Sequence, residues 1–425
     1  MLDIRLVREQ LDVVRDGMRR RGKLDELAPA LDRLEGLERE RREMIQAVEE
    51  RKARRNAISQ DVAKRKRAGE SADEQIAQGR ELGEEISRLE SERALAEAQL
   101  ERLLLDLPNI TRPDVPAGGE ECNQVVRSWG TPRPAGDDVR PHWEIGERLG
   151  ILDLPRGAKI TGSGFPVFRA GGARLVRALM SFLLDLHVRE HGYEEVCPPF
   201  VVNRATMTGT AQLPKFEDDM YGVRDDDLFL IPTAEVPVTN LYRDEILDPG
   251  MLPRGFVAFT PCFRREAGAA GKDTRGILRV HQFDKVELVR YSPQESSTQE
   301  LELLTSHAEK ALQLLGLAYR VVLLAAGDTG FASAKTYDLE VWAPGVGKYL
   351  ECSSCSVCDD FQARRANIRY RPAAGERPRL VHTLNGSALA FPRTIAALLE
   401  TYQNADGTVS VPEPLRPYLG ADRLG

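Results

Sequence analysis

Arginine, acidic and aromatic residues recur at close spacing in the segment 260–287, which reads TPCFRREAGAAGKDTRGILRVHQFDKVE. The pattern predicts a strand that ends in Arg-Arg-Glu, a loop rich in glycine and alanine that can bend around a ligand, and a returning strand. Guanidinium groups such as Arg264 and Arg279 bind phosphate or carboxylate, and the ring of Phe283 offers a face for a base. The segment indicates a site for a nucleotide and a small polar substrate, with an ordinary solvated hairpin as the alternative.

Three further segments place hydroxyl, carboxylate or guanidinium groups beside apolar runs. They carry Thr233, Ala234 and Glu235 after LFLIP, then Glu351, Ser353 and Ser354 after KYL, and finally Ser387 and Arg393 before an apolar helix. We expect the first two groups to end strands, where an acidic residue is usually solvated. Each segment is a weak signal by itself, but all of them are of the type that a single substrate pocket needs.

The order of arginine, aromatic and acidic residues across 260–287 resembles the second signature motif of class II aminoacyl-tRNA synthetases. Four other segments resemble the seryl-tRNA synthetases in particular: TAEVPVTNLYRDEIL (233–247), KTYDLEVW (335–342), SSCSVCDDFQARR (353–365) and HTLNGSALAFPRT (382–394). The resemblance runs from the first residue to the last segment. The stretch 385–393 departs from the general class II pattern, because only Gly386 and Arg393 fit it.

The resemblance implies an α+β fold, in which a class II catalytic domain with an antiparallel β-sheet and flanking helices follows an antiparallel coiled-coil arm. It implies that the serine carboxylate attacks the α-phosphate of ATP to give seryl-adenylate, and that the seryl group then passes to the 3′ end of tRNA(Ser) and of tRNA(Sec). Positioning and charge neutralisation dominate such a reaction, which explains the arginines and an expected Mg²⁺ ion. The rivals are a related synthetase for another small amino acid, a carrier-loading relative, and a non-catalytic RNA-binding protein.

The resemblance also implies an ATP site with two catalytic arginines, Arg264 on the α-phosphate and substrate carboxylate and Arg393 on adenine and the γ-phosphate. Glu266 would read the adenine amine and Phe283 would stack on the ring. The other residues implied for ATP are Arg265, Cys352 and Ser353, together with Glu351 and Ser354, which would hold Mg²⁺ through hard oxygen ligands.

For serine, the resemblance implies one group of residues around the ammonium and another around the hydroxyl. The ammonium group would contact Thr233, Ala234 and Glu235, and the hydroxyl would contact Glu287 and Ser387. A site that hydrogen-bonds a hydroxyl rejects an analogue without it by roughly 10⁴–10⁵, because a buried acceptor is left unpaired. We therefore expect alanine to be excluded without an editing domain.

Two patterns resemble metal sites without completing one. Cys352, Cys355 and Cys358 have C-x2-C-x2-C spacing, but Gln362 stands where a fourth cysteine would follow. His187 and His191 lie one helical turn apart and lack a third ligand. We expect structural thiols and no zinc. The stretch 268–273 is also two residues too short for a phosphate-binding loop of the Walker type.

The composition is that of a globular protein of 425 residues, with 42% hydrophobic residues and a net charge of −7. No stretch of 18 apolar residues occurs, and the first residues, MLDIRLVREQL, do not form a signal peptide, so we expect no membrane contact. Six cysteines in this length favour reduced thiols and a cytoplasmic location. A negative overall charge argues against attraction of nucleic acid to the whole surface.

The N-terminal part predicts two long helices, from about residue 27 to 67 and from about 73 to 107, whose apolar stripes can be buried only against each other. Gly69 suits a C-terminal cap, and Ser71 with Glu74 suits a capping box. Near the turn the chain is cationic through Arg51, Lys52, Arg54, Arg55, Lys64, Arg65, Lys66 and Arg67. A solvated surface is the alternative, but we expect these cations to bind tRNA.

Residues 108–141 are rich in proline and glycine and are expected to be a linker. It would join an N-terminal helical domain, 1–107, to a catalytic domain, 142–425. An apolar helix over 172–191 and the strand and proline after it resemble the first class II motif, which forms the interface of a homodimer.

Overall fold

The computed structural model describes residues 1–267 and 275–425. Gly268 and Gly271, which we expected to let the chain bend around a ligand, lie outside the described residues, as does the whole stretch 268–273 that resembles a phosphate-binding loop. The chain divides into two compact units, a helical unit formed by Leu2–Pro108 and a sheet unit formed by Met1 with Asn109–Gly425.

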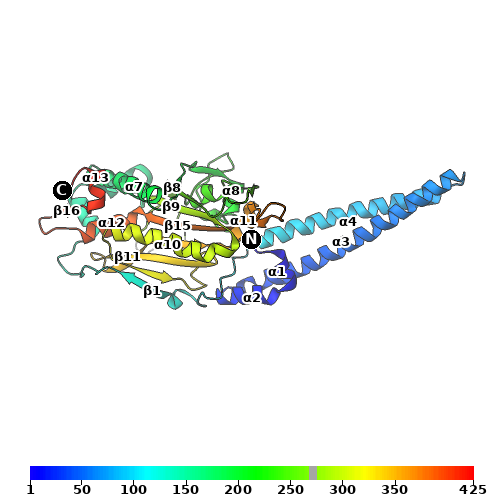
Figure 1. Cartoon of the computed structure of the whole chain (residues 1–425), viewed down its shortest axis with the longest axis horizontal. Coiled ribbons are helices and arrows are strands. Elements are labelled where there is room, and N and C mark those ends of the chain that lie inside the picture. The colour runs from blue at the N-terminus through cyan, green and yellow to red at the C-terminus, as the bar shows by residue number, and fades with distance from the viewer. Residues whose placement is uncertain (268–274) are drawn as a thin grey trace. The chain divides into compact units, whose positions relative to one another are not determined.

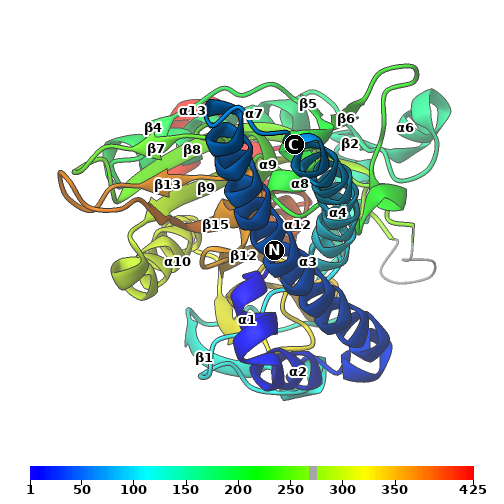
Figure 2. The same cartoon turned by 90° about the vertical axis from the view of Figure 1, so that its right-hand side faces the viewer.

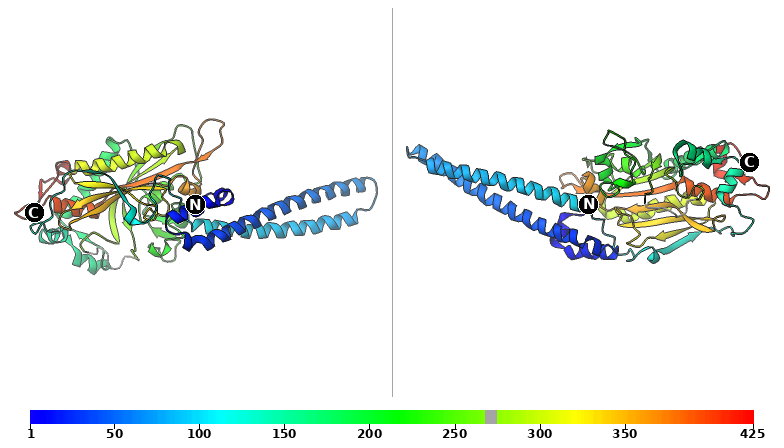
Figure 3. Two further views of the ribbon diagram at one scale, coloured as in Figure 1. Left: turned by 90° about the horizontal axis from the view of Figure 1, so that it is seen from below. Right: turned by 180° about the vertical axis from the view of Figure 1, so that it is seen from behind.

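The helical unit is built on two long helices, α3 (Leu24–Arg67) and α4 (Asp73–Leu105), which run side by side in opposite directions (Figures 1 and 3). Two short helices, α1 (Ile4–Glu9) and α2 (Leu11–Arg20), precede them. The buried apolar residues of the pair are Leu31, Leu34, Leu37, Val48, Leu82, Ile86, Ala96, Leu100 and Leu104. The predicted hairpin is therefore present.

The turn between α3 and α4 confirms one of the two predicted caps. Gly69 has a left-handed φ of +75°, and Glu70 N–H donates to the carbonyl of Arg65 at 3.0 Å, a Schellman pattern. The predicted capping box is wrong. Ala72 is the N-cap of α4 and makes no side-chain cap, and the Ser71 hydroxyl instead bonds Asp73 at 2.9 Å.

The sheet unit is organised around eight strands in the order β1-β10-β11-β12-β15-β9-β8-β4. Neighbours are antiparallel except β4 and β8, which are parallel. The bounds are β1 Gln124–Trp129, β4 Glu194–Glu195, β8 Arg254–Phe263, β9 Gln282–Ser292, β10 Tyr319–Leu323, β11 Lys335–Ala343, β12 Lys348–Val357 and β15 His382–Ala390. Figure 2 shows β8, β9, β15 and β12 following one another across the unit, with α10 along one side.

Three helices pack on one side of this sheet and form the main core with it: α7 (Gly171–Arg189), α10 (Ser297–Leu314) and α12 (Phe391–Thr401). Val286 and Leu288 of β9 point into this core. Because side chains alternate along a strand, residues 283, 285 and 287 face the opposite side. The sheet is mostly antiparallel, as the resemblance implies, and Lys285 and Glu287 stand on the face opposite this core.

Shorter elements complete the sheet unit. The helices are α5 His142–Arg148, α6 Leu154–Thr161, α8 Arg204–Gly209, α9 Glu235–Thr239, α11 Phe361–Ala366 and α13 Arg416–Leu419. The paired strands are β2 Leu152–Asp153 with β3 Val167–Phe168, β5 Val201–Asn203 with β6 Leu228–Leu230, β7 Ile246–Leu247 with β13 Arg369–Tyr370 and β14 Arg379–Leu380, and β16 Val409–Ser410 with β17 Arg423–Leu424. None of the helices in the described ranges has the length and apolar character of a membrane span.

The structure corrects the expectation that residues 108–141 form a linker. Residues 109–141 belong to the sheet unit, and β1 inside this stretch forms an edge of the eight-stranded sheet. The prolines and glycines do not leave the backbone in solvent, because Ala326 N–H donates to Pro116 O and Gly327 N–H to Gly118 O, both at 2.8 Å. The boundary between the two units falls after Pro108.

Candidate active site

The polar face of the sheet forms the floor of a cleft of about 1030 Å³. Its lining residues come from β9, β11, β12 and β15, from the start of α12, and from the segments 210–235, 264–267, 278–280 and 328–333. Most of the residues expected to bind substrates line it: Thr233, Glu235, Arg264, Glu266, Phe283, Glu287, Glu351, Cys352, Ser354, Ser387 and Arg393. Residues up to about 160 positions apart therefore meet in one cavity.

Glu287 lies at the buried centre of this floor, with only 2% of its surface exposed. It forms an ion pair with Lys285, which stands two positions earlier on β9, and it accepts a hydrogen bond from Ser387 Oγ at 3.4 Å. Lys285 Nζ also donates to Thr233 Oγ1 at 2.9 Å. The Lys285 ammonium group thus contacts a buried carboxylate and the Thr233 hydroxyl, and the Ser387 hydroxyl contacts the same carboxylate, so the charge of Lys285 is paired.

Glu235 begins α9 instead of ending a strand, since β6 stops at Leu230. Its Oε1 accepts from Gln362 Nε2 at 2.6 Å and from Asn385 Nδ2 at 3.0 Å. Burial, followed by the charge of Glu287, raises the pKa of Glu235 to about 7. A cation that entered beside Glu235 would favour its ionised form, so the carboxyl is suited to bind an ammonium group.

Arg264 follows the last residue of β8 and lies over the ring of Phe283 on β9, with its guanidinium carbon 5.2 Å from the ring centre. Its Nε donates to Pro232 O at 3.4 Å. Glu266, which has a left-handed φ of +51°, pairs with Arg279. Two arginines, an aromatic face and an acid therefore stand at one end of the cleft, as the sequence predicts.

Arg393 enters from the first turn of α12. Its guanidinium donates to Glu351 O at 2.8 Å, to Glu351 Oε2 at 3.1 Å and to Leu278 O at 3.3 Å. These bonds connect the start of α12 to Glu351 of β12 and to Leu278, which precedes β9. The Arg393 guanidinium is therefore held in place by three hydrogen bonds in the cleft that Arg264 and Phe283 also line.

Glu351 and Ser354 lie within β12, not at its end, where Ser354 is opposite Asp338 of β11 and Glu351 is opposite Glu340. Burial, and then the charge of Glu351, raises the pKa of Asp338 well above its ordinary value, while a hydrogen bond with Ser354 acts in the opposite direction. Asp338 Oδ1 is buried and has no hydrogen-bond partner among the described residues. Two carboxyls and a hydroxyl with an unused oxygen form a hard donor set that fits a divalent cation.

Three predicted residues lie outside the lining of the cleft. Ala234 is fully buried in a neighbouring core cluster, and Arg265 lies over the ring of Tyr221 at 5.9 Å. Ser353 is buried and donates to Ser387 O. Ser353 and Ser354 point to opposite sides because they are neighbours on a strand.

Several cleft residues were missed by the sequence reasoning. Lys285 stands midway between Phe283 and Glu287, so the two-residue period of the predicted strand was a usable signal. Asp338 and Asn385 lie in segments that carried the resemblance. Gln362, which does not line the cleft itself, also lies in such a segment, 353–365, but its hydrogen bond to Glu235 joins residues 127 positions apart and depends on the fold.

The cysteines and histidines that resemble metal ligands are packed as ordinary side chains. All six cysteines are free, and burial raises the pKa of the Cys355 thiol to about 12. His187 and His191 bond each other through their Nδ1 atoms at 2.9 Å, and burial lowers the pKa of His187 to about 3. Within residues 1–267 and 275–425, no group of three or more His, Cys, Asp or Glu side chains is arranged to hold a metal ion.

The eight predicted RNA-binding cations fall into two sets in the helical unit. Arg51, Lys52 and Arg65 form ion pairs with Glu85 at 2.6 Å, Glu90 at 2.9 Å and Asp61 at 3.0 Å. The other five, Arg54, Arg55, Lys64, Lys66 and Arg67, are exposed. The exposed set is the one that can reach a phosphate backbone without breaking an ion pair.

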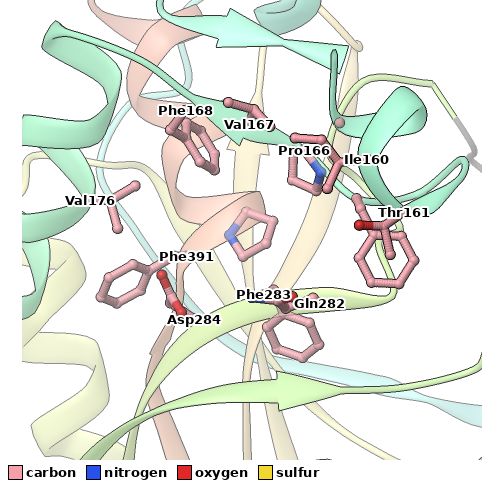
Figure 4. Close-up of a pocket in the computed structure, with 13 residues that line it drawn as sticks. Ile160, Thr161, Pro166, Val167, Phe168, Val176, Gln282, Phe283, Asp284 and Phe391 are labelled. Atoms are coloured by element: carbon pink, nitrogen blue, oxygen red, sulfur yellow. The ribbon is translucent and has the colours of Figure 1, made fainter. Parts of the chain in front are cut away.

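A smaller cavity of about 240 Å³ lies next to the cleft (Figure 4). Apolar residues of α6, β3 and α7 line it, and Phe283, Asp284 and Phe391 close it on the side of β9 and α12. In Figure 4, Asp284 and Phe391 lie close together while the Phe283 ring points to the other side of its strand. Burial raises the pKa of Asp284 to about 6.

Two family models match the chain. The model of the seryl-tRNA synthetase N-terminal domain matches residues 1–111, and that of the class II tRNA synthetase core domain (G, H, P, S and T) matches residues 215–402.

Relatives match over the full length. The serine–tRNA ligase of Gemmatimonas aurantiaca is 66% identical over 420 residues, 99% of each chain, and that of Geobacillus kaustophilus is 54% identical over 99% of each. The crystal structure of seryl-tRNA synthetase from Pyrococcus horikoshii complexed with ATP superposes with a TM-score of 0.96 at 40% identity, covering 100% of this chain and 99% of that one. With its cleft, its hairpin and these likenesses, the chain belongs to the seryl-tRNA synthetase (serine–tRNA ligase) family of class II aminoacyl-tRNA synthetases.

Proposed function

We propose that this protein activates L-serine with ATP to give seryl-adenylate and pyrophosphate, and then transfers the seryl group to the 3′ end of tRNA(Ser). The observation that carries the proposal is the position of Glu287 and Ser387 on the floor of the cleft that also holds Arg264, Phe283 and Arg393. A nucleotide-binding end and a hydroxyl-binding end then share one cavity, which is what amino-acid adenylation requires.

At the nucleotide end, Phe283 stacks on adenine, and Arg393, fixed by Glu351 and Leu278, covers the opposite face and the γ-phosphate. Arg264 neutralises charge on the α-phosphate, where the serine carboxylate attacks. Glu266 accepts a hydrogen bond from the adenine amine. Arg279, which pairs with Glu266, then either leaves this carboxylate or donates to a phosphate oxygen as well. Guanidinium groups suit this task because they stay charged and present a planar set of donors.

At the amino-acid end, Glu235 and the Thr233 hydroxyl bind the ammonium group, while Glu287 and Ser387 bind the side-chain hydroxyl. Lys285 holds the Glu287 carboxylate in place through the buried ion pair. Gln362 and Asn385 hold Glu235 in place through hydrogen bonds from their side-chain amides. Alanine lacks the hydroxyl, so it cannot donate the hydrogen bond that serine would give to the buried Glu287 carboxylate, and it is rejected on that ground.

The hard donor set of Glu351, Ser354 and Asp338 would hold Mg²⁺. Magnesium is commonly bound by one or two carboxylates together with substrate phosphates, so a complete ring of protein ligands is not required. When bound, the ion would neutralise charge on the phosphates of ATP. Arg393 contacts Glu351 and would share these phosphates with the ion.

The helical unit binds tRNA(Ser) in this proposal, through the exposed cations of α3, and the reaction places the protein in the cytoplasm, where ATP and tRNA are found. Charging of tRNA(Sec) and assembly as a homodimer through α7 and the strand after it stay predictions of the family resemblance. Their supports are the matched N-terminal domain and the apolar helix α7.

Pyrophosphate exchange with each of the twenty amino acids tests the proposal. We expect exchange with serine, with alanine lower by several orders of magnitude, and charging of tRNA(Ser) but not of unrelated tRNAs. Exchange driven by a different amino acid would point to a related synthetase, and no exchange with any of them would point to a non-catalytic RNA-binding protein.

A further inference from the structure

Residues 275–279, which lead into β9, are hydrogen-bonded to a buried histidine outside the cleft. His142, the first residue of α5, is fully buried, and its Nε2 accepts a hydrogen bond from the backbone N–H of Ile277 at 3.1 Å. On the other side of the ring, Nδ1 lies 2.7 Å from Glu400 Oε1. The imidazole therefore bridges α12 and the segment that carries Leu278 and Arg279.

The partners of the ring decide its tautomer. A backbone N–H can only donate, so Nε2 of His142 carries a lone pair and the proton is on Nδ1, where it is donated to Glu400. Glu400 is also fully buried, and it accepts from the backbone N–H groups of His142 at 2.9 Å, Gly345 at 2.8 Å and Val346 at 3.1 Å. Four donors fix this carboxylate, and the carboxylate fixes the ring.

Glu400 and Arg393 stand two turns apart on α12, and both act on the segment 275–279. Through His142, Glu400 fixes the N–H of Ile277, and Arg393 donates directly to the carbonyl of Leu278 at 3.3 Å. The segment is thus attached to one helix at two neighbouring peptide groups. A shift of Ile277 would move Leu278 O and with it the guanidinium that we assign to ATP.

The close packing of Gly276 and Arg275 on His142 and Trp143 leaves little room for such a shift. Gly276 has a φ of +65°, and a Cβ on it would lie 2.2 Å from His142 Nε2 and 2.9 Å from the Trp143 ring. The Arg275 guanidinium lies over that ring at 5.2 Å. Residues 275–277 are therefore seated on the His142–Trp143 pair.

We propose that His142 is a positioning residue: it holds the segment 276–279 against α12 so that Arg393 and Arg279 are in place for the phosphates of ATP. The inference rests on the proposed function, because ATP is the ligand of those arginines. His142 touches no substrate in this account. It acts through Ile277 and Leu278, and its effect falls on ATP and not on serine.

Two substitutions separate this role from a contribution to folding alone. His142→Asn keeps a donor near Nδ1 for Glu400 and lacks an acceptor for Ile277, whereas His142→Gln can present an oxygen near Nε2 and lacks the donor. We expect H142N to raise the KM for ATP about tenfold or more in serine-dependent pyrophosphate exchange, since small misplacements of binding groups are costly. The KM for serine should stay at the wild-type value, and H142Q should stay near wild type for both substrates.

If the proposal is right, melting temperatures measured on the same samples rank the two variants in the opposite order from the KM for ATP. H142Q loses the bond to a buried carboxylate and should therefore melt at a lower temperature than H142N. The proposal is overturned if the KM for ATP follows the loss of melting temperature in both variants, or if H142N changes the KM values for serine and ATP alike.

Gly276→Ala disturbs the contact between His142 and Ile277 by changing the segment instead of the histidine. It replaces H142N as the test if H142N does not fold. Its Cβ would push the segment away from His142 while the His142–Glu400 pair stays in place, so the KM for ATP should rise as in H142N. An unchanged KM for ATP in G276A would overturn the proposal. Failure of the wild-type protein to exchange pyrophosphate with serine would instead contradict the proposed function, whatever the variants do.

Discussion

Lys285 and Glu287 stand two positions apart on β9 and form a buried ion pair on the floor of the cleft, with 5% and 2% of their surfaces exposed. Breaking such a pair leaves an uncompensated charge, so both side chains are held in fixed positions. The Glu287 oxygen that pairs with Lys285, Oε2, also accepts from Ser387 Oγ, and Lys285 also donates to Thr233. The pair therefore sets the geometry of the amino-acid end.

Glu287→Gln removes the charged acceptor while it keeps the shape of the side chain. A hydrogen bond to a charged group contributes about 1.5–3 kcal/mol, so we expect kcat/KM for serine to fall by roughly 10- to 150-fold with little change in the KM for ATP. Steady-state pyrophosphate exchange with each substrate varied in turn measures both. An equal loss for ATP and serine would place Glu287 in the support of the whole cleft.

Glu235 should make serine activation depend on pH. Its pKa of about 7 lies above the ordinary value of 4.5, so the carboxyl is protonated below pH 7 and ionised above it. Binding of an ammonium group needs the ionised form, and kcat/KM for serine should therefore rise with pH through a midpoint near 7.

The same shift predicts the sign of a stability change. A raised pKa in the folded protein means that folding favours the protonated carboxyl, so this contribution to stability is complete below about pH 4.5 and is lost as the pH rises through 7. Glu235→Gln should flatten both the activity profile and this part of the stability profile. Profiles of E235Q that match those of the wild type would remove Glu235 from this role.

Arg264 should be indispensable for adenylate formation. Arg264→Ala removes the guanidinium over Phe283, and the loss of one preorganised charge-stabilising donor costs about 10²–10³ in kcat, so exchange should fall at least that far. Arg265→Ala is the matched control, because its side chain lies over Tyr221 and outside the cleft lining. Similar losses in the two variants would contradict the assignment.

The exposed cations of α3 should serve tRNA and not ATP. Replacing Arg54, Arg55, Lys64, Lys66 and Arg67 by glutamine should raise the KM for tRNA and flatten the salt dependence of charging, since each lost phosphate contact lowers the salt slope by about 0.7–0.9. Pyrophosphate exchange should not change. Glutamine at Arg51, Lys52 and Arg65 is the control, because these side chains are already engaged by Glu85, Glu90 and Asp61. Charging that depends equally on both sets would contradict the division.

Local periods made much of the architecture predictable. The apolar stripes of α3 and α4 have no partner except each other, and the short turn at Gly69 permits only an antiparallel pair. The hairpin of β8 and β9 was equally accessible, because a loop joins two β-type runs. The alternation along β9 already places Phe283, Lys285 and Glu287 on one face.

Composition gave a wrong prediction where backbone groups that we expected to contact solvent make tertiary hydrogen bonds instead. The proline- and glycine-rich stretch 108–141 indicates a linker, yet its backbone groups pair with residues about 200 positions away and β1 extends the sheet. The predicted capping box failed for a smaller reason: α4 begins at Asp73, so Ser71 is one residue too early to be its N-cap.

The sequence by itself determined the chemical inventory of the cleft and the local elements that carry it, because motif spacing and side-chain period act over a few residues. Only the tertiary structure decided which groups meet: Gln362 and Asn385 reach Glu235 across 127 and 150 positions, and His142 reaches Ile277 across 135. No local period encodes such pairs. They arise because strands distant in the chain are neighbours in the sheet, and because buried polar groups must find partners wherever the packed elements bring them.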